Sequence, residues 1–521
     1  TGDTADNMTY YSNPLFTFRP DGQPVTATRE IVKTEVCNGC HTTMAFHGGG
    51  RRETGLCILC HTTQSTDAGT GNILDLPQMI HKIHSGKTLP SVVGGTPYQI
   101  IGHGNTVNDY SDVGFPQDVR DCAVCHNGAA QSDVYLTKPT LEGCGSCHDR
   151  TWFGDATLTP AGYTNHPIAQ EDNTMCAGCH PATGNNASIP SLNRVHVTPE
   201  QSSSAPGLNL AIVSVTPNPA DGTLQTVVHV TNGAGQPITA LSQLTRLAVT
   251  VAYPASDYQT EFSERMIASG TSTVPGVVDA SDAANGNYGY TFKKTLPTGT
   301  SQTFALGVEG RSTFTIGTDP ATHTQAPTEN PIVFFTTDGS TPVPRRDVVD
   351  EANCLKCHFK LELHGGSRVS VPYCLFCHNS TLTAGTDDPP AESVHFDVLV
   401  HKIHRAENLT QPYVIGSLNA NEVTFPGLVQ ECTICHLDGT VDLPLPAEAT
   451  PTIITLTAGP PATTETVLPT RAACTACHDD PVVDTHATVM GDAATGAESC
   501  AVCHDATAPF SAAVSHALAL P

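Results

Sequence analysis

Apolar and polar residues alternate along one stretch of the chain, residues 205–340. Short runs rich in Val and Thr recur there between Gly, Pro and Asn residues, and they read NLAIVSVTPNP, TVVHVTN, RLAVTVAYP, YGYTFKKTLP and TFALGVEG. A period of two is typical of half-buried strands, and the turn signals between the runs favour antiparallel pairing. Apolar residues do not recur there at intervals of three and four, as they would in a helix. The pattern predicts an antiparallel β-sandwich or barrel.

The regions on either side are copies of each other. Residues 13–51 align with residues 330–368 without a gap, at the constant offset of 317 that separates Asn13 from Asn330. Further on, MIHKIHSG (79–86) matches LVHKIHRA (399–406), and each is followed by a Pro-Tyr pair, a Gly-rich turn and a Phe-Pro pair. Such self-similarity indicates duplicated structural units.

The repeat predicts the domain organisation. Residues 330–336 look like the last strand of the β domain, and residues 13–19 are their counterpart. The expected parts are an N-terminal tail of a missing β domain (1–28), a first module (29–204), the β domain (205–340) and a second module (341–521). Either the upstream β domain was removed or never present, or the N-terminal strand pairs elsewhere, for example with the sheet of a neighbouring molecule.

Both modules carry the motif Cys-x-x-Cys-His, which occurs ten times and uses all 20 cysteines. The cysteines are Cys37 and Cys40, Cys57 and Cys60, Cys122 and Cys125, Cys144 and Cys147, Cys176 and Cys179, Cys354 and Cys357, Cys374 and Cys377, Cys432 and Cys435, Cys474 and Cys477, and Cys500 and Cys503. The adjacent histidines are His41, His61, His126, His148, His180, His358, His378, His436, His478 and His504.

This motif attaches c-type haem: two thiols bond the porphyrin, and the histidine ligates the iron. Paired cysteines also occur in zinc sites and disulfides. Neither alternative explains a histidine after every pair with no cysteine left over. The motifs therefore predict ten covalently bound haems, five in each module.

Composition agrees with a chain that wraps cofactors. Hydrophobic residues make up 39% and charged residues 14% of the chain, below the roughly 45–50% and about 25% of ordinary domains. Porphyrin rings would supply the missing apolar surface, and the 44 Gly and 39 Pro favour loops. The predicted fold is a multidomain protein in which two loop-rich, haem-packed pentahaem modules with short helices flank a central antiparallel β domain.

The chain is strongly acidic, with a formal net charge of −26. This charge argues against nucleic acid as a partner and against electrostatic docking on anionic lipid. Calcium is a candidate ion for bridging carboxylates and haem propionates, although no EF-hand-type loop is present. No run approaches the roughly 20 apolar residues of a membrane helix. No signal peptide is present, so we expect Thr1 to follow a processing event. Because c-type haem is attached outside the cytoplasm, the motifs imply export.

The second axial ligand of each haem decides whether it carries electrons or also binds substrate. The repeat sorts the histidines outside the motifs into five pairs of counterparts, which gives ten candidates for ten haems. They are His47 and His364, His81 and His401, His84 and His404, His166 and His486, and His196 and His516. His81 and His84 are neighbours on one helical face, as are His401 and His404, and each can serve a different haem.

Several alternatives remain open at this level. A zinc site on the HKIH segments would use the same histidines, and His103 or His395 could replace one of the candidates. The six methionines do not recur in register, so methionine ligation is not predicted. Arg51 and Arg368 also align, and each is expected either to pair with a haem propionate or to be solvated.

Taken together, CxxCH, HGG-x-R, a second CxxCH and HKIH in two modules around a β domain resemble the OmcA/MtrC-type family of decahaem outer-membrane cytochromes. The resemblance implies a location on the outer cell surface or outside the cell. It also implies electron transfer through ten bis-histidine haems to metal oxides, flavins, electrodes or partner cytochromes, and contact with an outer-membrane conduit complex.

Two departures from that family are visible. Its members usually have two β domains and often a cysteine pair in one of them, so docking and flavin effects linked to those features are in doubt here. In outline, a shortened form is also similar to polymeric multihaem filaments. The rival class is a multihaem enzyme that reduces a nitrogen or sulfur oxyanion at an open haem. The histidine count disfavours it, because it leaves no iron open, and no CxxCK motif occurs. A soluble periplasmic shuttle is disfavoured by the β domain and the duplication.

Overall fold

The computed structural model describes residues 12–184, 191–316, 321–384, 391–457 and 461–516. Residues 1–11 of the predicted N-terminal tail lie outside the described residues. The chain forms two compact units. The first comprises Thr1–Thr198, Glu422–Val429 and Leu518–Pro521, and the second comprises Pro199–Asn421 and Gln430–Ala517.

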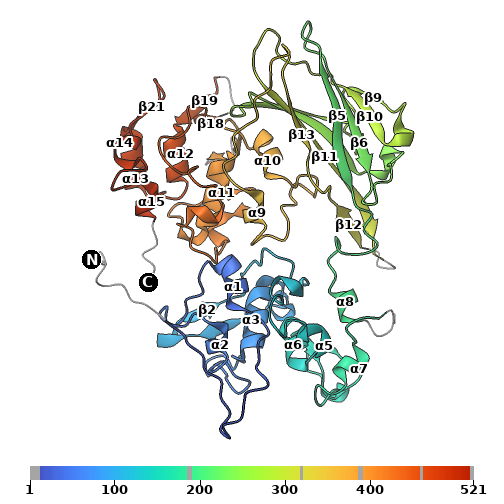
Figure 1. Ribbon diagram of the computed structural model, residues 1–521, viewed down its shortest axis with the longest axis vertical. Coiled ribbons are helices and arrows are strands. Elements are labelled where there is room, and N and C mark those ends of the chain that lie inside the picture. The colour runs from blue at the N-terminus through green and yellow to red at the C-terminus, as the bar shows by residue number, and fades with distance from the viewer. Residues whose placement is uncertain (1–11, 185–190, 317–320, 385–390, 458–460, 517–521) are drawn as a thin grey trace. The chain divides into compact units, whose positions relative to one another are not determined.

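The second unit contains a sandwich of two antiparallel sheets (Figure 1). One sheet has the order β5-β6-β10-β9 and the other the order β12-β11-β7-β8, and β13 also pairs with β11. The strands are β5 (Asn209–Pro217), β6 (Leu224–Thr231), β7 (Arg246–Tyr253), β8 (Thr260–Arg265), β9 (Val277–Asp279), β10 (Asn287–Thr291), β11 (Phe304–Thr315), β12 (Thr322–Gln325) and β13 (Ile332–Phe335). The predicted antiparallel β domain is confirmed, in its sandwich form. Each alternating run contains a strand.

The buried positions explain where alternation reveals a strand. In β6, Leu224, Thr226, Val228 and Val230 are buried in turn, because one face meets the core and the other meets solvent. Strands β7 and β11 are buried on both faces instead. The outer face of their sheet carries a second cluster, in which Tyr373 and Phe376 of the second module pack on Ala252 and Ala305.

The first unit is built from short elements. They are α1 (Thr34–His41), α2 (Thr54–Cys57), α3 (Leu76–Ser85), α4 (Pro90–Val93), α5 (Val134–Thr137), α6 (Leu141–Cys147), α7 (Cys176–Cys179), α8 (Leu192–Val195), β1 (Gln99–Ile101), β2 (Val107–Asp109), β3 (Thr151–Trp152) and β4 (Thr164–Asn165).

The second module has the same character. Its elements are α9 (Glu351–Cys354), α10 (Val371–Cys377), α11 (Phe396–Arg405), α12 (Pro469–Thr475), α13 (Pro481–Val489), α14 (Ala501–His504), α15 (Ala512–Ser515), β14 (Thr383–Ala384), β15 (Glu392–Ser393), β16 (Val414–Ile415), β17 (Leu418–Asn419), β18 (Thr452–Thr457), β19 (Thr463–Val467), β20 (Gly491–Asp492) and β21 (Ala497–Glu498). Short helices in loop-rich modules are therefore confirmed. Within the part of the chain that is described, no helix combines the length and apolar character needed to cross a bilayer.

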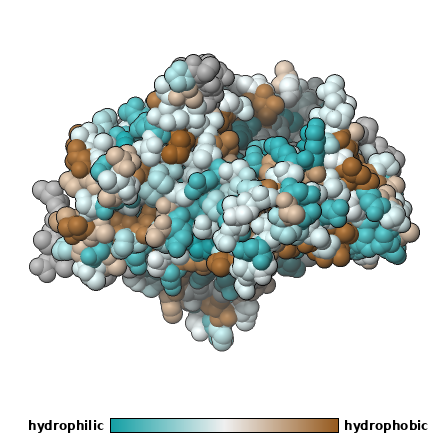
Figure 2. Space-filling view, turned by 90° about the horizontal axis from the view of Figure 1, so that it is seen from above, coloured by the Kyte–Doolittle hydropathy of each residue, from teal (hydrophilic) through white to brown (hydrophobic). Residues whose placement is uncertain are grey.

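Single 3₁₀ turns connect many of these elements. They are η2 (Gly86–Thr88), η3 (His103–Asn105), η4 (Cys122–Val124), η5 (Ala156–Leu158), η6 (Leu241–Gln243), η7 (Ala283–Asn285), η8 (Ala406–Asn408), η9 (Ala420–Glu422) and η10 (Cys432–Ile434). On the face shown in Figure 2, apolar patches are small and separated by hydrophilic residues.

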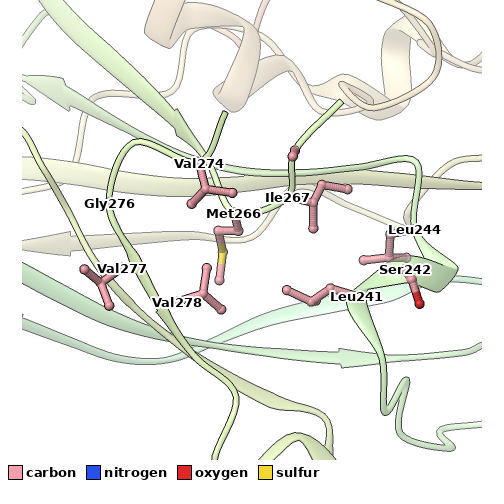
Figure 3. A pocket seen from close by; sticks show the side chains of 10 residues that line it. Leu241, Ser242, Leu244, Met266, Ile267, Val274, Gly276, Val277 and Val278 are labelled. Carbon is pink, nitrogen blue, oxygen red and sulfur yellow. The ribbon is translucent and has the colours of Figure 1, made fainter. Parts of the chain in front are cut away.

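One apolar pocket lies in the β-sandwich, between η6, the end of β8 and β9. Its lining residues are Leu241, Ser242, Leu244, Met266, Ile267, Ala268, Val274, Gly276, Val277 and Val278 (Figure 3). None of these residues is charged, a cysteine or a histidine, so the pocket offers no metal ligand of the kind found in the motifs.

Asn330 joins the sandwich to the second module. Its buried side chain donates through Nδ2 to Val308 O of β11 at 3.1 Å and to Ser367 O at 2.9 Å. The N–H of Val369 donates to Asn330 Oδ1 at 2.7 Å. This side chain thus ties β11 to the turn that precedes α10.

Replacing Asn330 by Ala should weaken this joint. The change leaves buried backbone groups without partners, at roughly 1–3 kcal/mol for each unsatisfied group. Amide hydrogen exchange at 367–370 should therefore become at least tenfold faster. The matched control is Asn13→Ala, whose side chain makes half-buried bonds in the first module and should leave these amides unchanged. Unchanged exchange in Asn330→Ala would contradict this role.

Candidate cofactor-binding site

Each Cys-x-x-Cys-His motif folds as one tight helical turn. Outside α1, where the motif completes a regular helix, the N–H of the motif histidine donates to the carbonyl of the first cysteine at 2.7–3.0 Å in every motif. One turn thus presents two thiols and an imidazole from five consecutive residues, which is the arrangement that covalent haem attachment requires.

Each motif histidine lies beside one further histidine ring. The ring centroids are 5.8–6.5 Å apart in the pairs His41–His84, His61–His47, His126–His81, His148–His196, His180–His166, His358–His404, His378–His364, His436–His401, His478–His516 and His504–His486. The structure brings together all twenty histidines that the sequence singled out. The pairing in the second module repeats that in the first, counterpart for counterpart.

The separation of the paired rings fits one metal ion between them. A bond from a first-row metal to an imidazole nitrogen is about 2 Å long, and the nitrogen lies about 1 Å from its ring centre. Two imidazoles on opposite sides of one iron would thus have centroids about 6 Å apart. The cysteine turn, the motif histidine and its partner ring therefore fit a six-coordinate c-type haem.

Helices α3 and α11 each serve two of these pairs. His81 lies beside His126, and His84 lies beside His41. Counterparts on α11 repeat the arrangement: His401 lies beside His436 and His404 beside His358. The two histidines of an HKIH segment therefore face different partners, whereas a zinc site would require both on one ion.

The HGG turns place two further rings in strained backbone. His47 and His364 have φ values of 51° and 53°, a left-handed conformation that is rare outside glycine. A glycine with positive φ follows each of them, and antiparallel bridges from Phe46 to Arg51 and from Leu363 to Arg368 close the turns. Strain of this kind accumulates at functional sites. The sequence showed the motif but gave no sign that the histidine itself is in this conformation.

Backbone carbonyls set the tautomer of several rings. His84 Nδ1 lies 2.9 Å from Ile80 O, and His404 Nδ1 lies 2.9 Å from Val400 O. A carbonyl only accepts, so each Nδ1 carries the proton, and Nε2 keeps the lone pair that a metal needs. Burial also favours the neutral imidazole. Burial, followed by the neighbouring His126, lowers the pKa of His81 to about 4.

The remaining histidines do not join these pairs. His395 contacts Thr452 Oγ1 and the carboxylate of Asp397, and His229 contacts Asn287 Oδ1. His323 packs near Phe314, and His103 lies in η3. Across the described ranges, no group of three or more His, Cys, Asp and Glu side chains is arranged to hold a metal ion.

Arg368 makes a contact that the sequence did not predict, and its pairing with a haem propionate stays a prediction. Its guanidinium forms an ion pair with Glu309 of β11, which is fully buried and also pairs with Arg246 of β7. The β-sandwich thus supplies the carboxylate for the arginine of the HGG-x-R turn.

Thiols of different motifs lie close enough to interact. Burial, followed by Cys125 and with a smaller effect from Cys57, raises the pKa of Cys37 to about 11. Likewise, burial and then Cys147 raise the pKa of Cys122 to about 11. Burial and then Cys176 raise the pKa of Cys144. These neighbours connect the five motifs of the first module.

In the second module, the thiols of four motifs interact with one another, and these motifs follow the same order as their counterparts in the first module. Burial and then Cys435 raise the pKa of Cys354 to about 11, and burial and then Cys500 do the same for Cys474. Cys477 is raised to a pKa of about 11 by burial, with a smaller contribution from Cys432. These contacts link the motifs that begin at Cys354, Cys432, Cys474 and Cys500 in that sequence.

The family model for outer membrane cytochromes of the MtrC/MtrF-like type, domains II/IV, matches residues 29–196 and 346–517. The chain belongs to the MtrC/MtrF-like outer membrane cytochrome family. These cytochromes are electron-transfer proteins with covalently bound haem, and they are exposed at the cell surface. The two matched segments fall in the two modules.

Relatives of this outer membrane cytochrome share the fold. The multiheme cytochrome MtrC of Shewanella baltica (strain OS185) is 24% identical over 549 aligned positions, covering 95% of this chain and 72% of MtrC. The crystal structure of the outer membrane decaheme cytochrome OmcA superposes with a TM-score of 0.68 at 21% identity, covering 95% of this chain and 76% of OmcA. The crystal structure of MtrC from S. baltica OS185 gives a TM-score of 0.63 at 20% identity, over 93% of this chain and 76% of MtrC. The multidomain fold predicted from the sequence is confirmed.

Proposed function

We propose that this cytochrome carries ten covalently attached haems and conducts electrons through them to acceptors outside the cell. In this proposal, each haem is bound by the two cysteines of one motif and ligated by one of the ten histidine pairs. The observation that carries the proposal is that every motif histidine has a second imidazole ring at the spacing of an axial ligand pair. A haem closed by two imidazoles supplies one-electron transfer rather than substrate chemistry.

The thiol neighbours support a linear order of sites. In the first module the motif of Cys57 adjoins that of Cys37, followed by the motifs of Cys122, Cys144 and Cys176. In the second module the order runs from the motif of Cys354 to that of Cys432 and on to those of Cys474 and Cys500. The protein's part in conduction is to fix these neighbours and to exclude water and ligands from the irons.

The proposed acceptors are ferric or manganese oxides, flavins, electrodes and partner cytochromes, with an outer-membrane conduit complex as the electron donor. The family's position at the cell surface supports this assignment. Terminal reduction of metals would need no further catalytic group, because electron transfer to the mineral suffices. Bound calcium, filament formation and self-assembly through the N-terminal strand stay predictions.

The competing proposal is a multihaem reductase acting on a small oxyanion. It requires an iron with an open position, and that iron would be high-spin in the resting protein. The paired rings leave each motif histidine with a partner, which favours the conductor.

The oxidised protein tests the two proposals directly. We expect ten haems per chain by pyridine haemochrome assay, and only low-spin ferric signals by electron paramagnetic resonance and magnetic circular dichroism. A high-spin signal amounting to one haem per chain would contradict the proposal that the protein only conducts electrons, and it would favour the reductase. A haem count below ten would show that at least one motif does not bind haem and would contradict the proposal of ten sites.

A further inference from the structure

The duplicated helices α3 and α11 differ by one charge beside a histidine pair. At the offset of 320 that separates His81 from His401, Pro77 of α3 corresponds to Asp397 in the first turn of α11. Side chains four positions apart are neighbours on one face of a helix. Asp397 is therefore a neighbour of His401, whereas the equivalent neighbour of His81 carries no charge.

The two ring pairs themselves are alike. The rings of His401 and His436 are 5.8 Å apart and inclined at 24°, and those of His81 and His126 are 6.2 Å apart and inclined at 27°. Nδ1 of His401 and Nδ1 of His81 are both buried, and neither has a hydrogen-bond partner among the described residues. A difference between the two sites therefore comes from their surroundings rather than from the geometry of the rings.

Two groups hold the carboxylate of Asp397 in its charged form. The N–H of Val398 donates to Asp397 Oδ1 at 2.7 Å, and Nδ1 of the buried His395 lies 2.9 Å from the same oxygen. Burial alone would raise the pKa of Asp397, but the hydrogen bond and charge of His395, with smaller effects of Val398 and His401, lower it. The carboxylate is therefore negative at neutral pH.

This charge reaches His401 and has no counterpart at His81. Burial lowers the pKa of His401, and the charge of Asp397 opposes that effect. Burial also lowers the pKa of His81 to about 4, and no carboxylate of the described residues contributes to it. In the first module Asp75, the N-cap of α3, stands at the position of His395 instead.

Nearby cations are matched by other carboxylates. Arg346 interacts with Asp397, but it also interacts with Asp257 and Glu448. Arg345 pairs with Asp257 at 2.9 Å. The two arginines are thus balanced by two further acids, which leaves Asp397 as the net charge beside the ring pair.

We propose that Asp397 lowers the reduction potential of the haem at the Cys432 motif below that of its counterpart at the Cys122 motif. Reduction adds one electron to the ferric iron and forms or breaks no bond, and a fixed negative charge opposes this gain. A carboxylate near Nδ1 of an axial imidazole also makes that ligand more basic, which favours the ferric state. The inference rests on the ligation proposed above and deepens it.

A lower potential at this haem would make the two modules electrically unequal. In the order proposed for the second module, the Cys432 motif lies between those of Cys354 and Cys474. An electron that reaches the haem of the Cys432 motif would leave it readily for either neighbour. The second module would thus contain a step in potential that the first module lacks.

The test is a spectroelectrochemical titration of the holoprotein at about pH 8, above the range in which histidines ordinarily titrate. Asp397→Asn should move one haem of ten to a higher potential. We expect at least a tenfold change in its ratio of ferric to ferrous iron at a fixed potential, which is about 59 mV for one electron. Glu407→Gln is the matched control, because Glu407 is exposed in η8 and its charge is screened. An unchanged titration curve in Asp397→Asn would overturn the proposal.

A conservative variant separates the charge of Asp397 from its place in the helix. An acidic residue in the first turn also stabilises a helix, and this role would not set a potential. Asp397→Glu keeps the charge, so it should keep the lower potential that Asp397→Asn loses. Equal shifts in the two variants would overturn the role of charge.

Ligand variants identify which haem responds. In the proposed ligation, His401→Ala leaves the haem of the Cys432 motif as the single high-spin haem, whose signal can be titrated alone. Adding Asp397→Asn should change the ferric-to-ferrous ratio of this haem at least tenfold. Adding it to His81→Ala, where the open haem is that of the Cys122 motif, should leave the signal unchanged. A shift in both backgrounds would overturn the assignment to one haem.

Haem count and spin state separate this inference from the proposal on which it rests. Ten low-spin haems with unchanged potentials in Asp397→Asn would overturn the tuning and leave conduction standing. A high-spin haem that appears only in Asp397→Asn would show that Asp397 holds His401 in place, and it would also overturn the tuning. Fewer than ten haems in the unaltered protein would contradict the proposed ligation itself.

Discussion

Replacing His81 by Ala should open one haem of ten to carbon monoxide. His81 lies beside His126 at a ring separation of 6.2 Å. Under the proposed ligation, its removal would leave the iron at that motif with one protein ligand. An open position admits exogenous ligands and shifts the iron towards high spin. Titration with carbon monoxide should saturate at one equivalent per chain, and electron transfer through the first module should slow.

His103→Ala is the matched control for this variant, because His103 lies in the same module and outside the ring pairs. It should bind no carbon monoxide. His401→Ala should repeat the His81→Ala result in the second module, since His401 pairs with His436. If His81→Ala takes up no carbon monoxide, then His81 is not an axial ligand.

Replacing Glu309 by Ala should loosen the sandwich from the second module. Glu309 is fully buried between Arg246 and Arg368, and its loss leaves two guanidinium groups without their carboxylate. Removing one partner of a buried ion pair costs about 3–5 kcal/mol. We expect a cost at the lower end of this range, because both arginines keep partial access to water.

Hydrogen exchange at the amides of β11 measures this loss locally, without assuming that the whole chain unfolds in one step. A loss of about 3 kcal/mol corresponds to exchange about a hundredfold faster. Arg19→Ala serves as the control, since its ion pair with Asp21 is exposed and should leave β11 unchanged. Unaltered exchange in Glu309→Ala would mean that the buried pair does not hold the two parts together.

The sequence predicted most of the site because its chemistry is local or duplicated. A motif of five residues fixes the thiols and one imidazole, and the repeat identifies the second imidazole without any knowledge of the fold. Which ring partners which motif was beyond the sequence. His47 lies beside the histidine of the motif that follows it, whereas His84 lies beside one 43 positions earlier, and only the path of the chain decides this.

The sequence did not predict strands that are too short or too polar to show alternating apolar and polar residues. Strands β8, β9 and β12 are short or polar, so alternation did not reveal them. The role of Arg368 depended on Glu309, a residue 59 positions away. Sequence reasoning considered only solvent or a propionate for that guanidinium, because nothing local indicates that a strand of another domain supplies a carboxylate.

The two-sided role of α3 has a consequence for how the protein matures. His84 serves a motif that precedes α3, and His81 serves one that begins at Cys122, after it. In the proposed ligation, a chain that receives its haems from the N-terminus onward would acquire the first haem before the helix that supplies its second ligand. Both histidines of the helix would be engaged only after a later haem is attached. Under this proposal, the iron at the motif of His41 would stay open on one side until α3 folds beside it.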